Sequence, residues 1–469
     1  MLLERVYDED LAQASYFIGC QAKGEAIVID PRRDIDVYLD LAEKNGMRIV
    51  AVTETHIHAD YLSGTRELAA RTGARMHVSD EGGPDWTYGP DFDSAVRMKH
   101  GHRIRLGNIT VEASHTPGHT PEHISLLIAK EDARDAPFAV LSGGSLLVSA
   151  AGRTDLRGSE HVDELTRSQF ETLRGFFLSL DDKVQVWPTH VHGSPCGAAI
   201  GDRTSTTIGY ERRHNPLLQH ADEASFREAA LADLPPKPSY YPRLRGRNTS
   251  AQPTGAPSAG IRPLAPTAFA AAMATGDTLV LDTRELLAFG GSHIPGALNI
   301  GAAGSLGIWA GWMLESGQPL LLVLESDEQL HEVVTHLGRT GFDRFAGYLA
   351  GGMPAWQNAG QPLQALQQLH VTEAAALSER GELALVDVRS PQEWTAGHAP
   401  GARHLFLPEL PSRLGDLPVD GPIAVYCATG YRASIAASLL QARGFEVANI
   451  PGSWQAWTER GLPVAKERT

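Results

Sequence analysis

The chain has 469 residues, 42% of them hydrophobic and 21% charged, which is too long for one core, so about three domains are expected. The 41 Lys and Arg against 56 Asp and Glu give a formal net charge of −15, which argues against a nucleic-acid partner, and no stretch approaches the roughly 20 apolar residues of a membrane span. The three cysteines, Cys20, Cys196 and Cys427, are too few for a disulfide framework, and with an N-terminus unlike a signal peptide they favour a reducing cytoplasm.

The first 245 residues alternate between strand-like and helical stretches. The strand-like runs include "AIVID", "MRIVAVTET", "RIRLGNITVEAS" and "FAVLSGG", and the stretch "DYLSGTRELAARTG" has a helical pattern. Several of these strands end on His or Asp. The pattern predicts an α/β sandwich whose site lies on the loops beyond the strand ends.

Histidines gather in three loops that each follow a predicted strand. In "TETHIHADYLSG" the residues His56, His58 and Asp60 alternate, and alternate residues of an extended loop point the same way. The loops "SHTPGHTPEHIS" and "VWPTHVHGSPCG" add His115, His119, His123, His190 and His192. A lone histidine is usually solvated or hydrogen-bonded, but three such loops together predict a metal site.

The motifs "THIHADYLSG", "HTPGHTPEH", "GRTDL" and "PTHVHGSPCG" resemble the metallo-β-lactamase fold, an αββα sandwich, and most of all its persulfide dioxygenase branch. The segment "STTIGYERRHNP" is similar to the one that closes this domain where it is fused to rhodanese modules. The resemblance implies metal ligands at His56, His58 and His119. In the dioxygenase branch, one Fe(II) sits on two histidines and one carboxylate.

Two residues depart from the family pattern. Gly144 stands where the family has a ligating Asp, and Tyr61 stands where binuclear hydrolases of this fold have a further His. Both departures remove ligands of a second metal, so a binuclear zinc hydrolase is disfavoured. Three imidazoles still suffice for one ion, Fe(II) or else zinc, held more weakly than in the family. A site that has lost its metal is the alternative.

The remaining residues near this site have smaller expected roles. The resemblance implies that Arg153 lies near the carboxylate of the substrate, and an ion pair with Asp155 is the equally weighted alternative. Asp60 and His190 are expected beside the metal rather than bound to it. A last group is expected to be structural: His115, His123, Cys20 in a strand, and Cys196, for which uptake of sulfur is the alternative.

A segment rich in Pro, Gly and Ser, "RGRNTSAQPTGAPSAGIRPLAP", begins at Arg245, and we expect a linker at 246–261. Beyond it the chain repeats itself at an offset of 105, so that Asp282 matches Asp387 and Pro295 matches Pro400. Each copy has the pattern of a compact parallel α/β domain. The expected domains are therefore 1–245, 262–365 and 366–469.

The second repeat carries a candidate nucleophile. "PIAVYCATGYRASIAASLL" predicts an apolar strand, a loop from Cys427 to Arg432, and a helix from near Ala433. A thiolate at such a place is stabilised by loop amides, by the helix N-terminus and by Arg432. The loop resembles that of rhodanese, and "DVRSPQEWTAGHAPGA" resembles the upstream rhodanese signature, with Asp387 and Arg389 matching. The resemblance implies that Cys427 takes sulfur from a persulfide or thiosulfate.

The first repeat lacks this nucleophile. In "PLLLVLESDEQLHEVV" either Leu324 or Glu325 falls where the cysteine would be, and the acidic residues that follow would repel an anionic sulfur substrate. We expect a non-catalytic rhodanese-like domain.

The resulting hypothesis is an enzyme that oxidises a low-molecular-weight thiol persulfide with O2 to sulfite, coupled to rhodanese-type transfer that involves thiosulfate. The alternative is a sulfurtransferase only, with a degenerate metal site at Gly144. A zinc hydrolase and a non-enzymatic sulfur carrier are weaker alternatives. The sequence leaves open the thiol that carries the persulfide and the oligomeric state, a homo-oligomer included, and it predicts no membrane partner.

Overall fold

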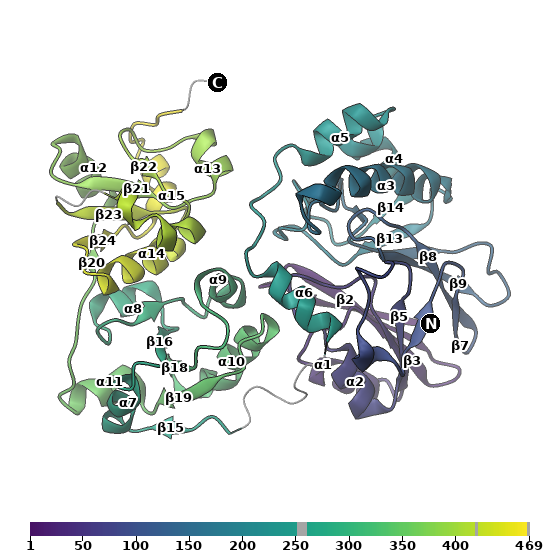
Figure 1. Cartoon of the computed structure of the whole chain (residues 1–469), viewed down its shortest axis with the longest axis horizontal. Helices are drawn as coiled ribbons and strands as arrows, with labels where there is room; N and C mark the ends of the chain where they lie inside the picture. Colours follow the sequence, from purple (N-terminus) through teal and green to yellow (C-terminus); the bar gives the residue numbers. More distant parts are fainter. Residues whose placement is uncertain (251–259, 418–420, 467–469) are drawn as a thin grey trace. The chain divides into compact units, whose positions relative to one another are not determined.

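The computed structural model describes residues 1–250, 260–417 and 421–466. The chain divides into two compact units (Figure 1), Met1–Ala256 with 339–341, and Pro257–Gly338 with Phe342–Thr469. Most of the expected linker, residues 251–259, lies outside the described residues.

Two six-stranded sheets form the centre of the first unit. One sheet has the order β1-β2-β3-β4-β5-β6, made of β1 (Leu2–Asp8), β2 (Gln13–Cys20), β3 (Glu25–Ile29), β4 (Arg48–Thr53), β5 (Arg75–Ser79) and β6 (Val96–Met98). The other has the order β14-β13-β10-β9-β8-β7, made of β7 (Arg103–Leu106), β8 (Ile109–His115), β9 (Ile124–Lys130), β10 (Ala139–Gly143), β13 (Gln185–Pro188) and β14 (Thr206–Thr207). A small ribbon pairs β11 (Leu146–Leu147) with β12 (Ala150–Ala151).

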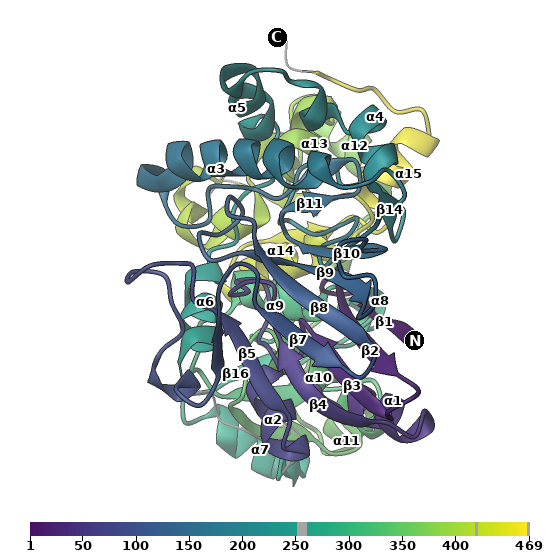
Figure 2. The same ribbon diagram turned by 90° about the vertical axis from the view of Figure 1, so that its right-hand side faces the viewer.

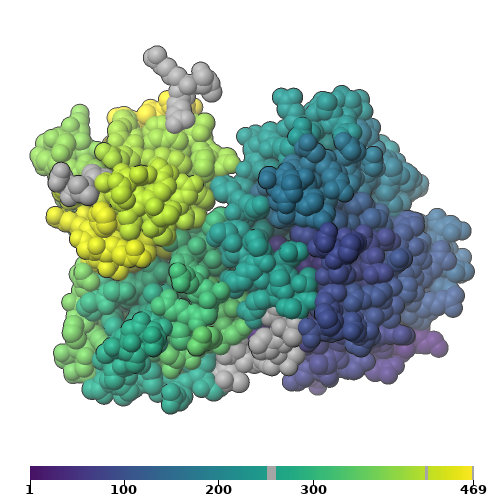
Figure 3. Space-filling model, viewed as in Figure 1, coloured from purple at the N-terminus to yellow at the C-terminus, as the bar shows by residue number. Residues whose placement is uncertain are grey.

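Helices cover the outer face of each sheet. Beside the first sheet lie α1 (Asp36–Lys44) and α2 (Thr65–Thr72), and beside the second lie α3 (Val162–Gly175), α4 (Ile208–His214) and α5 (Glu223–Leu231). Figure 2 shows the two groups of helices on opposite sides of the two sheets, and in Figure 3 the blue and teal residues of α3 and α5 form the outer surface on their side.

The alternation of side chains along β2 illustrates why the layers form. Tyr16 and Ile18 belong to the core between the two sheets, whereas the intervening Phe17 packs with Tyr38 of α1 on the opposite face. Successive residues of a strand point to opposite faces, so a strand that is apolar throughout is buried on both. The predicted αββα sandwich is confirmed.

The second unit contains two parallel five-stranded sheets with the same strand order. The first, β15-β19-β18-β16-β17, is made of β15 (Pro263–Leu264), β16 (Leu279–Asp282), β17 (Leu298–Asn299), β18 (Leu320–Val323) and β19 (Phe345–Leu349). The second, β20-β24-β23-β21-β22, is made of β20 (Gln367–Gln368), β21 (Ala384–Asp387), β22 (Arg403–His404), β23 (Ile423–Tyr426) and β24 (Val447–Asn449).

The helices of the second unit also follow the repeat. The first copy has α7 (Pro266–Met273), α8 (Leu286–Gly291), α9 (Leu306–Met313), α10 (Leu330–Arg339) and α11 (Gly352–Asn358). The second copy has α12 (Val371–Glu379), α13 (Pro391–Ala396), α14 (Tyr431–Ala442) and α15 (Ser453–Glu459). One hydrophobic cluster runs through both copies, so they are packed together within this unit. The two predicted parallel α/β repeats are confirmed.

Two element boundaries differ from the sequence-based prediction. Helix α6 (Tyr241–Thr249) occupies the start of the expected linker, because Leu244 and Asn248 are buried in the first unit. Helix α14 begins at Tyr431 rather than near Ala433, because Gly430 adopts φ 113° and serves as its N-cap. Among the described helices, none combines the length and the apolar character needed to cross a bilayer.

Candidate metal centre and cysteine loop

Three strand ends of the first unit lead to the side chains of the predicted metal site, which are the three expected ligands and the expected neighbours Asp60 and His190. Strand β4 leads into the loop with His56, His58 and Asp60, β8 leads to His119, and β13 leads to His190. The five side chains are buried, with at most 5% of their surface exposed. The loops therefore converge inside the unit rather than on its surface.

The side chains form two overlapping groups. One ligand atom each of His56, His119 and His190 lie within 4.8 Å of one another, and the same holds for His58, Asp60 and His190. This differs from the expected grouping of His56, His58 and His119. His190, expected to lie beside the metal, belongs to both groups, and His58 belongs only to the second.

Asp30, which the sequence interpretation missed, explains the position of His58. Its Oδ1 lies 3.0 Å from Nε2 of His58 and accepts a hydrogen bond from the main-chain N–H of Thr55 at 2.6 Å. Its Oδ2 accepts hydrogen bonds from the hydroxyls of Thr55 and Thr189. Asp30 follows β3 with φ 52°, and the strand "AIVID" that ends on Asp was the available signal.

Several polar atoms at the cluster are buried without a hydrogen-bond partner in the part of the chain that is described. They are Nε2 of His119, both ring nitrogens of His190, Nδ1 of His58 and both carboxylate oxygens of Asp60. A buried polar atom without a partner costs about 1–3 kcal/mol, so such a concentration requires an explanation. Nitrogen and carboxylate donors are those that iron and zinc bind in proteins, and the cluster fits one such ion.

The electrostatic environment keeps most of these imidazoles neutral. Burial lowers the pKa of His119 to about 3 and lowers that of His56 well below its usual range. Burial also lowers the pKa of His190, although the Asp60 carboxylate opposes it. Burial acts in the same direction on His58, but the Asp30 carboxylate outweighs it and the pKa is raised. Neutral imidazole is the form that binds a metal ion.

Residue 153 orients His119 through its main chain. The carbonyl oxygen of Arg153 lies 2.9 Å from Nδ1 of His119, which leaves Nε2 directed elsewhere. The Arg153 guanidinium forms two hydrogen bonds to Asp155, at 2.6 and 2.8 Å, and one to the carbonyl oxygen of Pro195 at 2.9 Å. The structure thus has the ion pair with Asp155 in place of a guanidinium open to a substrate carboxylate.

The glycine turn at Gly144 is fixed by His123. The main-chain N–H of Gly144 donates to Nε2 of His123 at 3.0 Å, and Nδ1 of that ring lies 2.8 Å from the Thr116 hydroxyl. His115 lies 2.8 Å from the carbonyl oxygen of Pro121 through its Nε2. Both histidines therefore have the structural contacts expected of them.

Two further residues border the cluster. Cys196 is buried with its Sγ 3.6 Å from the Tyr241 hydroxyl, and burial raises the pKa of its thiol to about 12. A thiol that stays protonated is a poor nucleophile. Asn248 donates hydrogen bonds to the carbonyl oxygens of His58 at 2.7 Å and Tyr61 at 2.8 Å. The sequence carried no signal for Asn248, which lay in the expected linker.

The candidate nucleophile of the second unit lies in a tight loop. Cys427 directly follows β23 and is buried, and its Sγ accepts a hydrogen bond from the main-chain N–H of Gly430 at 3.1 Å. The Cys427 main-chain N–H donates to the Ser453 hydroxyl at 3.1 Å. Helix α14 begins at the next residue after Gly430. The sulfur thus faces the N-terminal end of a helix, where a negative charge is stabilised.

Arg432 is anchored by a carboxylate. Its two terminal nitrogens donate to the two carboxylate oxygens of Glu393 at 2.6 and 2.7 Å. Burial alone would raise the pKa of Glu393, but Arg432 outweighs it and the pKa falls to about 2. The bidentate pair fixes a positive charge close to the cysteine loop.

Asp387 and Arg389 form a closed ion pair. Arg389 donates from its Nε and Nη2 to Asp387 at 2.6–3.0 Å and from Nη2 to the carbonyl oxygen of Gly397 at 2.7 Å. The first repeat contains the same arrangement between Arg284 and Asp282, although it lacks the cysteine. The pair therefore builds the fold in both copies.

Strand pairing identifies the residue that replaces the cysteine in the first repeat. Val323 pairs with Asp282 in the first sheet as Tyr426 pairs with Asp387 in the second. Leu324 therefore corresponds to Cys427. Its side chain is buried, so this position of the first repeat is part of the hydrophobic core.

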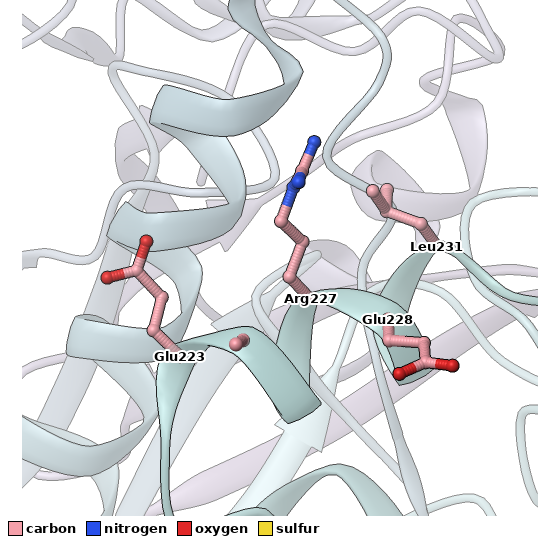
Figure 4. A pocket seen from close by; sticks show the side chains of 5 residues that line it. Glu223, Arg227, Glu228 and Leu231 are labelled. Atoms are coloured by element: carbon pink, nitrogen blue, oxygen red, sulfur yellow. The ribbon is translucent and has the colours of Figure 1, made fainter.

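A separate hollow of ≈ 650 Å³ lies along α5, lined by Glu223, Ala224, Arg227, Glu228 and Leu231 (Figure 4). All five residues come from one surface helix. None of the residues of the histidine cluster or the cysteine loop lines it, so this hollow is not the candidate site.

Comparison with known proteins identifies the parts of the chain. Residues 8–133 match the model of the metallo-β-lactamase superfamily, and residues 265–359 and 370–460 each match that of the rhodanese-like domain. A crystal structure of a metallo-β-lactamase from Staphylococcus aureus subsp. aureus COL is 32% identical and has a TM-score of 0.67. The match covers 74% of this chain and 98% of that one, so it extends beyond the first unit.

The curated proteins that match about half of the chain include the following two. An uncharacterised protein of Mycobacterium leprae is 30% identical over 223 residues, which are 44% of this chain and 92% of that protein. The mitochondrial persulfide dioxygenase ETHE1 of Mus musculus is 24% identical over 242 residues, which are 50% of this chain and 83% of that protein.

Proposed function

This chain belongs to the metallo-β-lactamase superfamily and carries two rhodanese-like domains after the metallo-β-lactamase domain, and from that premise we propose that it is an enzyme of sulfur metabolism. The first unit would oxidise a low-molecular-weight persulfide to sulfite. The second would transfer sulfur through Cys427. The observation that carries the proposal is that one chain contains both sites. One is a buried histidine cluster in which several donor atoms lack hydrogen-bond partners among the described residues, and the other is a cysteine loop that ends at the N-terminus of a helix.

The oxidation is balanced as R–S–SH + O2 + H2O giving R–SH, SO3²⁻ and two protons. The outer sulfur is oxidised, O2 is reduced, and the S–S bond breaks with the thiol as the leaving group. A ferrous ion would supply the electron-transfer chemistry with O2 that closed-shell protein groups lack. The histidine cluster would hold it, with Asp60 beside it. Zinc, the alternative ion, has no redox chemistry and would not support this oxidation.

The residues of the chain prepare the site in two ways. Burial keeps the imidazoles of His56 and His119 neutral, which leaves their lone pairs available. Hydrogen bonds to Asp30 and to the Arg153 carbonyl fix the rings of His58 and His119. A ligand such as His119, held by an outer partner, loses less conformational freedom on binding.

The transfer step uses the second unit. The Cys427 thiolate would attack the outer sulfur of thiosulfate, which forms Cys427–S–S⁻ and releases sulfite as the leaving group. In the reverse direction, sulfite from the first reaction would take up that sulfur to give thiosulfate. The Gly430 N–H, the start of α14 and Arg432 would stabilise the negative charge on sulfur. Since both sites belong to one chain, the sulfite from one is concentrated near the other.

Two measurements on the full chain test the proposal. The iron-loaded protein, prepared without air, should consume O2 and produce sulfite with glutathione persulfide as the probe, and His119→Ala should abolish both. Thiosulfate:cyanide turnover should be lost in Cys427→Ser and kept in Cys196→Ser, a matched buried cysteine.

The second candidate function is sulfur transfer alone, and Gly144 is the observation that favours it. Iron-loaded protein that transfers sulfur but takes up no O2 would establish this candidate and overturn the oxidation. A wild type with neither activity would exclude both candidates and leave a sulfur carrier or a hydrolase.

A further inference from the structure

We propose that the metal ion of the first unit is held by three imidazoles, those of His56, His119 and His190. His190 would take the place of the carboxylate that Gly144 cannot supply, and His58 would stand outside the ligand set. The inference rests on the proposed function only in requiring that this unit binds a metal ion. The proposed ligand set differs from the set expected from the sequence, which was His56, His58 and His119. It also differs from the second group in the structure, which is His58, Asp60 and His190.

The first argument is steric and concerns Gly144. A Cβ atom on this residue would lie 2.7 Å from Nε2 of His119 and closer still to Cδ2 of the same ring. Carbon and nitrogen atoms do not approach so closely, so any side chain at position 144 must displace the ring. The imidazole of His119 already fills the space from which a carboxylate would project.

The ring of His119 has little room to yield. Its Nδ1 lies 2.9 Å from the carbonyl oxygen of Arg153, and a Cβ atom on Gly152 would lie 2.8 Å from the same nitrogen. The ring therefore fits a slot between two glycines, Gly144 and Gly152. Protein interiors are close-packed, and a buried ring in such a slot moves only if its surroundings move.

The second argument concerns His190, whose main chain is held in place and whose ring nitrogens make no hydrogen bond to the described residues. His190 forms an isolated antiparallel β-bridge with Gln13, and the main-chain N–H of Ala14 donates a hydrogen bond to the Thr189 carbonyl oxygen at 2.8 Å. The imidazole is fully buried, and neither ring nitrogen has a hydrogen-bond partner within the described ranges. Its ring centroid lies 5.5 Å from that of His56 and 5.5 Å from that of His119.

Asp60 supplies the negative charge that position 144 lacks. Its Oδ2 lies 3.5 Å from Nδ1 of His190, and 5% of the residue is exposed. A carboxylate beside Nδ1 favours the tautomer with the proton on that nitrogen, which leaves the lone pair of Nε2 for a cation. A carboxylate behind a ligating histidine also raises its basicity.

The position of His58 distinguishes the proposed ligand set from the two alternative sets, both of which include His58. Its Nε2 is engaged by the Asp30 carboxylate at 3.0 Å, and its Nδ1 lies 3.8 Å from Oδ1 of Asp60. His58 therefore belongs to the group with Asp60. Because the two groups share His190, one ion per chain is expected.

The test measures metal content rather than activity. The full chain and four variants, His56→Ala, His119→Ala, His190→Ala and His58→Gln, are incubated with Fe(II) without air, desalted and analysed by mass spectrometry. We expect about one ion per chain in the wild type and in His58→Gln, whose amide can still donate to Asp30, and at least a tenfold loss in the other three. Circular dichroism and thermal unfolding verify that each variant is folded.

Each competing ligand set gives a different pattern. Loss in His58→Gln with retention in His190→Ala would overturn the proposal in favour of His56, His58 and His119. If His58→Gln and His190→Ala both lose the metal while His56→Ala and His119→Ala keep it, the ligands would be those of the second group instead. A wild type without metal would overturn the proposal outright.

Gly144→Asp provides an opposite expectation. If the site simply lacks a carboxylate, restoring it should tighten metal binding, and that result would overturn the proposal. We expect Gly144→Asp and Gly144→Ala to lose metal, because both displace His119. Gly175→Ala, where nothing lies within 4 Å of the new Cβ atom, is the matched control.

If the variants do not fold, an experiment on the wild-type protein can still identify the metal ligands. Anomalous scattering at the iron edge in crystals of the full chain should place the ion within bonding distance of the three imidazoles. This outcome is independent of the persulfide reaction. Metal at this site without O2 uptake would overturn the proposed oxidation alone, and O2 uptake with the ion on His58 would overturn the ligand assignment alone.

Discussion

The hydroxyl of Tyr431 donates a hydrogen bond to the main-chain carbonyl oxygen of Gly301 at 2.8 Å. Tyr431 follows directly on the cysteine loop of the second repeat, and Gly301 belongs to the first repeat. Ser434 of α14 also donates, to the side-chain oxygen of Asn299 at 2.6 Å. The repeat without a nucleophile thus contacts the helix start that faces Cys427.

Gly304→Ala tests whether this contact matters for sulfur transfer. The new Cβ atom would lie 2.6 Å from Cε2 of Tyr431, so the ring must move. Overpacking of this kind costs about 1–3 kcal/mol of unfolding free energy, and we expect thiosulfate:cyanide turnover to fall with it. Tyr431→Phe removes the hydrogen bond to Gly301, worth about 0.5–1.5 kcal/mol, and should have a smaller effect.

Gly291→Ala is the control for this prediction, because nothing lies within 4 Å of its Cβ position. Unfolding in urea measures the free energy, and kcat and KM are determined separately. A Gly304→Ala protein with a lowered unfolding free energy and an unchanged kcat would limit the contact to a structural role.

A cysteine at position 324 should not create a second transfer site. Leu324 corresponds to Cys427, but the residues after it are Glu325, Ser326 and Asp327 rather than a glycine-containing loop with an arginine. The double variant Leu324→Cys with Cys427→Ser is therefore expected to be inactive in thiosulfate:cyanide turnover. Turnover above the level of Cys427→Ser alone would contradict the assignment of a structural role to this repeat.

The pair of Glu393 and Arg432 makes stability depend on acid pH. The folded pKa of Glu393, about 2, lies below the ordinary value near 4.3 of an unfolded chain. A lowered folded pKa stabilises the protein at pH values above the unfolded pKa, and the contribution disappears as the pH falls from about 4 to about 2. Glu393→Gln should remove this part of the pH dependence.

Urea unfolding of the wild type and Glu393→Gln at several pH values measures this difference. The two proteins should differ most near neutral pH and converge at pH 2. Glu446→Gln, an exposed carboxylate of the same repeat, should follow the wild type throughout. A difference that is constant with pH would show that the lost contact, not the charge, stabilises the fold.

Metal loading should stabilise the first unit by mass action. A ligand at a hundred times its dissociation constant adds about 2.7 kcal/mol to the unfolding free energy. Differential scanning calorimetry with and without Fe(II), in the absence of air, should show an upward shift that a chelator reverses. His119→Ala should lose the shift and His115→Ala, whose ring is bonded to the Pro121 carbonyl, should keep it.

Local sequence patterns predicted most of the architecture correctly. The apolar strands, the repeat at a fixed offset and the position of Cys427 all depend on short-range order along the chain, which a sequence displays directly. The helix start was misplaced by two residues, from Ala433 to Tyr431, because the positive φ of Gly430 ends the loop early.

The details of the metal centre depended on contacts that a sequence does not display. The motif pattern presented His58 beside His56, but the pairing of His58 with Asp30 joins residues 28 positions apart. The place of His190 follows from β13 lying beside β10, which is a property of the sheet and not of the loop sequence. The sequence showed that Gly144 lacks the expected carboxylate, but it could not show that the ring of His119 fills the space of that carboxylate.

The position of Asn248 determines how this protein can be divided. Its amide nitrogen reaches across about 190 residues to the carbonyl oxygens of the loop that carries His58 and Asp60. A chain cut after residue 245, where the composition changes, loses this amide and the last four of the nine residues of α6. Anyone isolating the N-terminal half for metal or oxygen assays should therefore retain the residues through Thr249, since a shorter fragment would report on an untethered loop.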